Sequence, residues 1–371
     1  MFISLLPPPV TEGEAARQSA VIRDQVAALG RQQLAVVADA QVLRRADRIG
    51  LSGIDTEALP AELLAPRLTR MRSRWKLRAH VQTRRVPELE QALAVAVDRL
   101  RARHEVEAIL TPPDTPVLKH LAYRQKLPLL QYEYGAVDEP EWGLVRVEAR
   151  TGPRRADILQ RFRTFCWLRH RAGTPALSRD ELLRLVHGRA AAPALPQTAR
   201  FRLGIVVEGE STDCVQRFSA ADLVSMARES HAAADILIRH QSPALARFAP
   251  ACGVGDDSPT SAAFIGQCET VATVASAVAL EAMLLGRRTL VLGESPLRLA
   301  ADPGFGTRRD PSQQLLALNF LVGSLHAPAG LIFDAEYLTW RLGQPSELAL
   351  YERHIDWLQQ SRDTSLLARP A

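Results

Sequence analysis

Residues 270–293 constrain the fold of this chain more than any other stretch, because TVATVASAVALEAMLLGRRTLVLG combines a strand, a helix and a second strand. The β-branched run Thr270–Val274 is typical of a buried strand. Ser276 suits the N-cap of a following helix, and Gly286 suits its end. A second apolar strand, Thr289–Leu292, comes next. Such a unit predicts a doubly wound parallel sheet and therefore an α/β protein.

The helix expected over residues 277–285 has two features that suit a ligand. Its first turn, after Ser276, would offer backbone N–H groups to an anion. Glu281 is the one charged residue on this otherwise apolar helix. A buried carboxylate needs polar partners, and ribose hydroxyls are suitable ones. A solvent-facing glutamate on an ordinary helix explains the same spacing, so both interpretations stay open at this point.

Composition excludes several classes of protein. The chain has 371 residues, 47% of them hydrophobic, which is enough for two domains. No run approaches the ~20 apolar residues of a membrane span, and MFISLLPPP is too short and too proline-rich for a secretory signal. The four cysteines form no CxxC pair and the nine histidines no HxxxH pair. We therefore expect a cytoplasmic protein without a metal or other cofactor.

The net charge of +5 is concentrated in one basic segment. Residues 67–85 hold eight arginine or lysine side chains, and no acidic residue lies between Leu63 and Pro87. Only Trp75 interleaves these charges and no nucleic-acid reader motif is present, so a nucleic-acid partner is not expected. A peripheral contact with an anionic membrane, an acidic glycan and an ordinary solvated helix face each explain the segment.

The coarse pattern predicts two Rossmann-like domains and C-terminal helices. The first domain, residues 1–195, is expected to contain helices at 12–48 and 88–104, a loop and helix over 112–124, strands at 106–110 and 127–132, and helical sequence over 154–190. The second, residues 196–335, is expected to contain strands at 201–207 and 235–239, a helix at 220–230 and the 270–293 unit. The Ala/Pro-rich tract 190–196 is the expected linker, and helices within 336–371 are expected to pack back. The simplest architecture that fits this order of elements is GT-B-type, with the ligand in a cleft between the two domains.

Charged side chains follow several predicted strands. They are Glu133, then Glu208, Glu210 and Asp213, and then His240. The carboxyl ends of parallel strands meet at one sheet edge, so these groups are expected near a ligand. One carboxylate attacking an electron-poor carbon while another moves protons is the division of labour of glycosyl chemistry. The same residues are also explained by structural roles: carboxylates that cap helices or pair with arginines, and a histidine that stabilises the fold. Spacing alone does not distinguish these structural roles from catalytic ones.

Other common chemistries lack their motifs. No GxGxxG follows the first strand, and neither GxxxxGK[ST] nor GxSxG occurs in the chain. Dinucleotide, P-loop and α/β-hydrolase functions are therefore disfavoured. The remaining interpretation is a fold that binds a nucleotide through helix N-termini.

Three segments of the C-terminal half resemble a known family: LGIVVEGESTDCVQRFSAADLVSMARE, ADILIRHQSP and ETVATVASAVALEAMLLGRRTLVLGESP. They are similar to the bacterial capsule-polysaccharide synthesis family, and more narrowly to its retaining β-Kdo glycosyltransferases. The family's Ser-x-x-Gly-Phe-Glu-Ala-Leu helix corresponds to Ser276–Met283, and its Gly-Lys-x-Val strand begins at Gly286. In the N-terminal half, LPLLQYEYG matches a family strand that is followed by Glu-Asp-Gly-Phe.

The resemblance implies a donor, a fold and a set of roles. It implies CMP-β-Kdo as donor, a GT-B fold with the nucleotide on the C-terminal domain, and metal-free transfer with retention to an oligosaccharide or lipid-linked glycan of a capsule or O-antigen. Residue by residue, it implies Asp213 as nucleophile, Glu133 as acid/base, His240 on the donor phosphate, and donor contacts from Glu208, Arg239, Ser276 and Glu281.

The chain also departs from the family pattern. Gln241 replaces the proline after the histidine, Arg239 is the nearest substitute for a family lysine, and Tyr134 replaces an aspartate. These changes bear on acceptor recognition more than on donor use. Three alternatives therefore stay open: transfer from CMP-sialic acid, transfer from a UDP-hexose, and a non-catalytic glycan- or lipid-binding scaffold.

Overall fold

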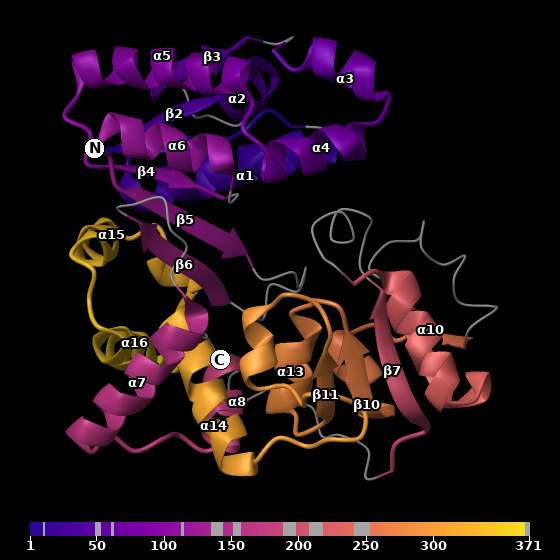
Figure 1. The fold of residues 1–371 in the computed structure, drawn as a ribbon. Helices are drawn as coiled ribbons and strands as arrows, with labels where there is room; N and C mark the ends of the chain where they lie inside the picture. Colours follow the sequence, from indigo (N-terminus) through magenta and orange to yellow (C-terminus); the bar gives the residue numbers. More distant parts are fainter. Residues whose placement is uncertain are drawn as a thin grey trace. The chain divides into compact units, whose positions relative to one another are not determined.

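The computed structural model describes residues 1–9, 12–48, 53–60, 63–112, 115–134, 144–150, 157–187, 198–207, 218–240 and 253–367. The chain forms two compact units, each built from several separate segments (Figure 1). Unit 1 comprises Met1–Tyr134, Val145–Arg155 and Ala329–Pro345. Unit 2 comprises Gly135–Leu144, Ala156–Pro328 and Ser346–Ala371. The units therefore do not follow a single cut at residues 195/196, and the helical sequence after residue 156 is part of unit 2.

Unit 1 is an α/β unit built on a sheet whose strands lie in the order β6-β5-β4-β1-β2-β3. Strands β1 to β5 are parallel, and β6 runs antiparallel to β5. The elements of this part are β1 (Phe2–Leu5), α1 (Glu12–Leu29), β2 (Leu34–Asp39), α2 (Ala40–Asp47), β3 (Asp55–Leu59), α3 (Ala65–Met71), α4 (Arg74–Thr83), α5 (Pro87–Arg103), β4 (Ala108–Thr111), α6 (Pro116–Gln125), β5 (Leu129–Tyr134), β6 (Leu144–Arg150), η6 (Ala329–Leu331) and α15 (Ala335–Leu342). Apolar strand residues such as Ile3, Val37 and Ile109 form a buried core with helix residues including Leu93 and Leu121.

The single helix expected over residues 12–48 is wrong. Helix α1 ends at Leu29, and Gly30 follows with φ of 78°, a left-handed conformation that glycine adopts without steric cost. The apolar run Leu34–Asp39 then pairs in parallel with β1 and β3. Asp39 accepts a hydrogen bond from the backbone N–H of Gln41 and so caps the next helix, α2. Strand pairing outweighed the helical periodicity of this region.

Unit 2 is also α/β, and the five strands of its sheet are all parallel, in the order β11-β10-β7-β8-β9. Its elements are α7 (Ile158–Ala172), α8 (Arg179–His187), β7 (Phe201–Val207), α10 (Ala220–Ser230), η2 (Ala233–Asp235), β8 (Ile236–His240), β9 (Val254–Gly255), α12 (Ser261–Gly266), β10 (Cys268–Thr273), α13 (Val278–Leu284), β11 (Arg288–Val291), η4 (Pro296–Leu299), α14 (Pro311–Asn319), the π-helical η5 (Phe320–Leu325), β12 (His326–Pro328) and α16 (Glu347–Leu367). The doubly wound α/β class and the presence of two Rossmann-like sheets are confirmed.

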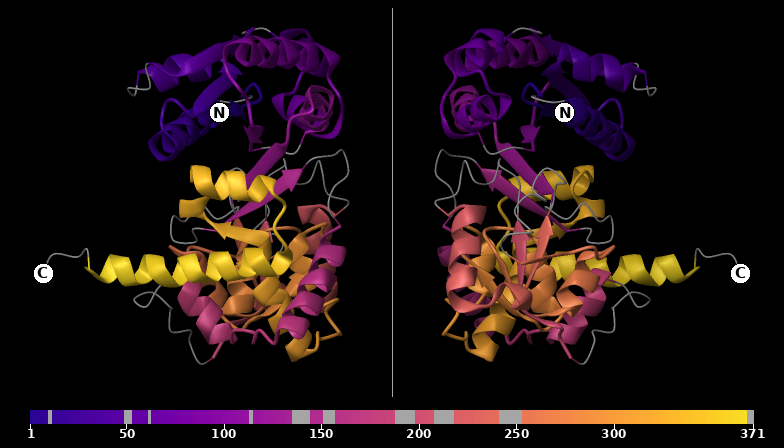
Figure 2. Two further views of the ribbon diagram at one scale, coloured as in Figure 1. Left: turned by 90° about the vertical axis from the view of Figure 1, so that its left-hand side faces the viewer. Right: turned by 90° about the vertical axis from the view of Figure 1, so that its right-hand side faces the viewer.

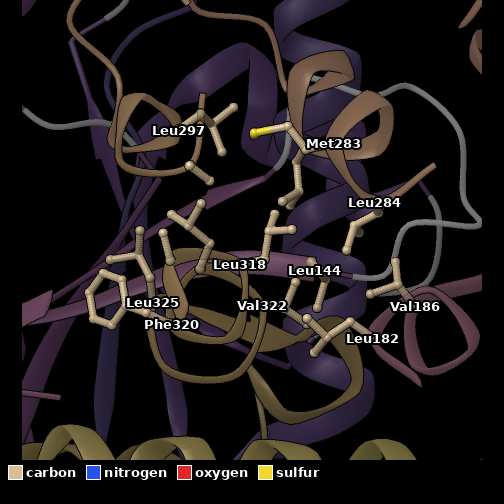
Figure 3. Close-up of a cluster of buried hydrophobic side chains, with 14 of the residues drawn as sticks. Leu144, Leu182, Val186, Met283, Leu284, Leu297, Leu318, Phe320, Val322 and Leu325 are labelled. Carbon is tan, nitrogen blue, oxygen red and sulfur yellow. The ribbon is translucent and has the colours of Figure 1, made fainter. Parts of the chain in front are cut away.

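Helix α13, the centre of the 270–293 segment, lies between two apolar clusters. Val278 and Ala282 pack on the sheet side with Phe264 of α12. Figure 3 shows Met283 and Leu284 on the other side, among side chains of α8, α14 and η5 that include Leu182 and Leu318. The helix is apolar nearly all round because both of its faces are covered.

The expected packing of the C-terminal helix is present within unit 2. Helix α16, yellow in Figure 2, packs against α7, α8 and η5. Arg161 of α7 donates hydrogen bonds to Glu347 of α16 at 2.5 and 3.0 Å. Ser324 of η5 donates to the same carboxylate at 2.5 Å. Among the described residues, no helix is both long and apolar enough to cross a membrane.

Candidate active site

The carboxyl edge of the unit 2 sheet gathers the ends of three strands. Strand β7 lies between β8 and β10. Val207, the last residue of β7, is in register with His240 of β8, and Val206 is in register with Thr273 of β10. The end of β7 therefore lies between the end of β8 and the end of β10. The candidate residues Glu208, Glu210 and Asp213, which follow β7 in the sequence, lie outside the described residues.

His240 ends β8 at this edge. Because side chains two residues apart in a strand share a face, His240 lies on the same sheet face as Ile236 and Ile238, which pack against α10. Both of its ring nitrogens are buried, and neither has a hydrogen-bond partner among the described residues. Burial lowers the pKa of the imidazole below its usual 6.5, because the charged form loses water. At neutral pH the ring is therefore uncharged and can both donate and accept a hydrogen bond.

Arg239 points to the opposite sheet face, because successive strand residues alternate. Its guanidinium donates to Asp256 at 2.7 Å and to the Ser258 carbonyl at 3.1 Å. The guanidinium carbon also lies 5.8 Å from the centre of the Phe264 ring. Arg239 and His240 are thus neighbours in sequence that do not converge on one point. The donor contact of Arg239 stays a prediction.

Glu281 of α13 is completely buried, with 0% of its surface exposed. The solvent-facing interpretation of this residue is therefore wrong. Its neighbours along the helix, Leu280 and Ala282, are buried apolar residues. A buried carboxylate of this kind has a specific structural or ligand-binding use, since its desolvation is costly.

Ser276 is also buried, but the start of α13 differs from the expected arrangement. The helix begins at Val278, and Ala277 occupies the cap position. The N–H groups of Val278 and Ala279 donate to the hydroxyl and carbonyl of Ser276, at 3.3 and 3.1 Å. The N–H of Leu280 donates to the Ala277 carbonyl at 2.9 Å. These N–H groups were expected to face an anion, and in this structure each already has an acceptor.

Glu133 lies at the end of β5 in unit 1, and its side chain is 71% exposed. It is in register with Arg146 of β6, whose guanidinium donates to it at 3.5 Å. Arg146 is itself buried and also forms an ion pair with Glu148. The carboxylate of Glu133 therefore faces solvent with one buried cation behind it.

Sequence reasoning missed the polar residues that surround Glu133. Gln131 of β5 is in register with Thr111 of β4 on one side and Glu148 of β6 on the other, and all three are buried. Strand β6 was not predicted, although residues 145–150 alternate apolar and charged side chains with the period of a strand. That alternation was the signal for Arg146 and Glu148.

The described residues contain no group of three or more His, Cys, Asp or Glu side chains placed to hold a metal ion.

Comparison with known proteins gives one family match. Residues 49–146, about a quarter of the 371 residues, match the sequence model described as the Glycosyltransferase 99 family N-terminal domain. A search of curated proteins found no match. The family match and the two Rossmann-like sheets together support a glycosyltransferase.

Three solved structures illustrate the likeness. Thermosulfurimonas dismutans KpsC, a beta Kdo 2,7 transferase, is 13% identical with a TM-score of 0.41, over 68% of this chain and 90% of that chain. The beta Kdo 2,4 transferase of the same organism is 12% identical with a TM-score of 0.33, over 57% and 79%. Anabaena HepE in complex with UDP is 12% identical with a TM-score of 0.34, over 97% and 100%. The function of this chain is inferred from its own residues and the family match.

Proposed function

We propose that this chain is a retaining β-Kdo glycosyltransferase, which moves Kdo from CMP-β-Kdo to a capsule or O-antigen acceptor without a metal. One observation carries the proposal: β7, the strand that precedes Glu208 and Asp213 in the sequence, lies between the strand that ends at His240 and the strand that leads to Ser276. These are the three segments whose motifs resemble the family. The match of residues 49–146 to a glycosyltransferase domain supports the same class of reaction.

The proposed reaction is a double displacement. A carboxylate oxygen of Asp213 forms a bond to the anomeric carbon of Kdo while the bond to the CMP phosphate breaks and CMP leaves with the electron pair. An acceptor hydroxyl then attacks the same carbon, Glu133 takes its proton, and the Asp213 carboxylate leaves. Two inversions at one carbon give net retention.

His240 is assigned to the donor phosphate. Its buried, uncharged imidazole donates a hydrogen bond from one nitrogen. Negative charge on the departing CMP would favour the protonated ring, so His240 would become a cation where the transition state needs one. Arg239 and Glu208 are assigned as further donor contacts.

Glu281 and Ser276 are assigned to the cytidine monophosphate. A carboxylate accepts hydrogen bonds from both ribose hydroxyls. Because Glu281 has no exposed surface, contact with a ribose requires its side chain or the covering residues to move. The phosphate would compete with Ser276 for the N–H groups at the start of α13.

The test is the mass of the intact protein after incubation with CMP-Kdo generated in situ and an acid quench. The expected result is one added Kdo that maps to Asp213. Asp213→Ala should give no adduct and no transfer. Glu133→Gln should accumulate the adduct when acceptor is present, because only the second step needs the base. An adduct on another residue, or wild-type turnover by Asp213→Ala, would contradict the nucleophile assignment.

A further inference from the structure

Helix α7 has an apolar face that belongs to the core of unit 2. Phe165 is buried, with its ring 5.7 Å from Phe320 and 5.4 Å from Tyr351. Arg161 on this side is bound by Glu347. The helix contains no acidic residue, so its remaining cations are not balanced from within it.

The outward face of α7 combines exposed apolar and cationic side chains. Trp167 is 56% exposed and Leu159 is 44% exposed. Arg163, His170 and Arg171 are exposed as well. At 3.6 residues per turn, these five residues occupy about one third of the helix circumference. They form one continuous stripe, called here the α7 stripe.

Two features of the α7 stripe, one contact and the absence of ion pairs among the described residues, distinguish it from an ordinary solvated surface. The guanidinium carbon of Arg171 lies 5.3 Å from the centre of the Trp167 ring, a cation–π geometry that holds both groups at the surface. Neither Arg163 nor Arg171 forms an ion pair within the described part of the chain. By contrast, Arg67 and Arg85 of the basic 67–85 segment bind Glu88 and Glu90 at 2.8 Å.

We propose that the α7 stripe docks on an anionic lipid surface. Tryptophan and arginine together suit the headgroup layer, because the ring is amphipathic and the cation meets lipid phosphates. The charge of the stripe is complementary to such a surface. A stable protein interface takes roughly 20–30 residues from each partner, far more than this stripe supplies. The proposal goes beyond the glycosyltransferase function and does not depend on the donor.

The test is co-sedimentation of the full chain with phosphatidylcholine vesicles, with and without added phosphatidylglycerol. We expect binding only to the anionic vesicles. Arg163→Gln/Arg171→Gln should weaken it about thirtyfold, since each arginine near an anionic surface contributes about fivefold. Trp167→Ser should weaken vesicle binding about tenfold, because the variant lacks the ring that the lipid surface would bury. All of these positions are exposed, so circular dichroism melting should not change.

Matched controls separate this surface from general charge. Arg70→Gln/Arg84→Gln removes two exposed arginines from the 67–85 segment and leaves the α7 stripe unchanged. Tyr123→Ser removes an aromatic ring that is 60% exposed on α6. Both controls should bind as wild type does. The proposal is overturned if Trp167→Ser binds normally, or if the Arg70/Arg84 control loses binding while the α7 variants keep it. If the α7 variants lose self-association of the protein and keep vesicle binding, the partner that occupies the α7 stripe is instead a second copy of the chain.

Discussion

At the scale of single residues, the alternation of strand side chains separates Arg239 from His240. Arg239 is held by Asp256 beside Phe264 on one face of the sheet. His240 sits on the other face, with two buried ring nitrogens and no partner among the described residues. The sequence predicted Arg239 as the last residue of a strand and His240 as the residue after it, but their opposite environments follow from which helix covers each face of the sheet. His240 is therefore the stronger candidate for a ligand contact.

The titration of His240 predicts how donor affinity depends on pH. Burial keeps the pKa below 6.5 in the free protein, and a bound phosphate would raise it. The complex then binds more protons than the free protein, so affinity falls as the pH rises through the pKa of the complex. The expected loss is about tenfold per unit of pKa difference.

Isothermal titration with CMP-Kdo between pH 5.5 and 8, in buffers of different ionisation enthalpy, measures this dependence and its proton uptake. His240→Asn should lack both. His231→Asn, which precedes the amino end of the same strand, is the control and should retain them. Equal pH dependence in wild type and His240→Asn would remove His240 from the phosphate site.

At the scale of elements, strands and helices with strong local signals matched their predictions. The structure places β7 over Phe201–Val207 and α10 over Ala220–Ser230, as expected. The capping box of Ser219 and Asp222 starts α10. Strand β2 was missed because the helical periodicity of residues 12–48 was read through it, and β6 was missed although its own residues alternate apolar and charged side chains.

Close packing within unit 2 predicts the effect of one small substitution. A Cβ on Gly204 of β7 would lie 2.5 Å from the Cys268 sulfur and 2.8 Å from the Phe264 ring. Gly204→Ala should therefore lower the free energy of unfolding by about 1–3 kcal/mol. Gly306→Ala is the control, because a Cβ there would have no heavy atom within 4 Å. Urea denaturation measures both, and equal stabilities would contradict the packing of α12 on β7.

At the scale of the whole molecule, the two units do not divide the chain at a single point. Residues 329–345, after the whole unit 2 sheet, belong to unit 1, and residues 346–371 belong to unit 2 again. No shift in amino-acid composition marks these returns in the sequence. The α/β class of both units was predictable, because strand and helix signals repeat along the chain. The cleft between two domains stays a prediction.

Assignment of the nucleotide to unit 2 predicts a localised response to ligand. CMP should slow amide hydrogen exchange at the end of β8 and from β10 through α13, because a ligand bound to the native state suppresses local opening. It should leave β4 and β5 of unit 1 unchanged. UDP should have little effect if the donor is a CMP-sugar. Protection by UDP alone would favour a UDP-hexose donor, and protection by neither nucleotide would favour a binding scaffold.

The sequence by itself determined the α/β class, the strand–helix–strand order of residues 270–293 and the positions of His240, Ser276 and Glu281 at or after strand ends. Local propensities and short spacings carry that information. Only the tertiary structure decided that Glu281 is fully buried, that Arg239 is bound by Asp256, and that Arg146 lies behind Glu133. Burial and ion pairing depend on residues distant in sequence, so no local pattern specifies them.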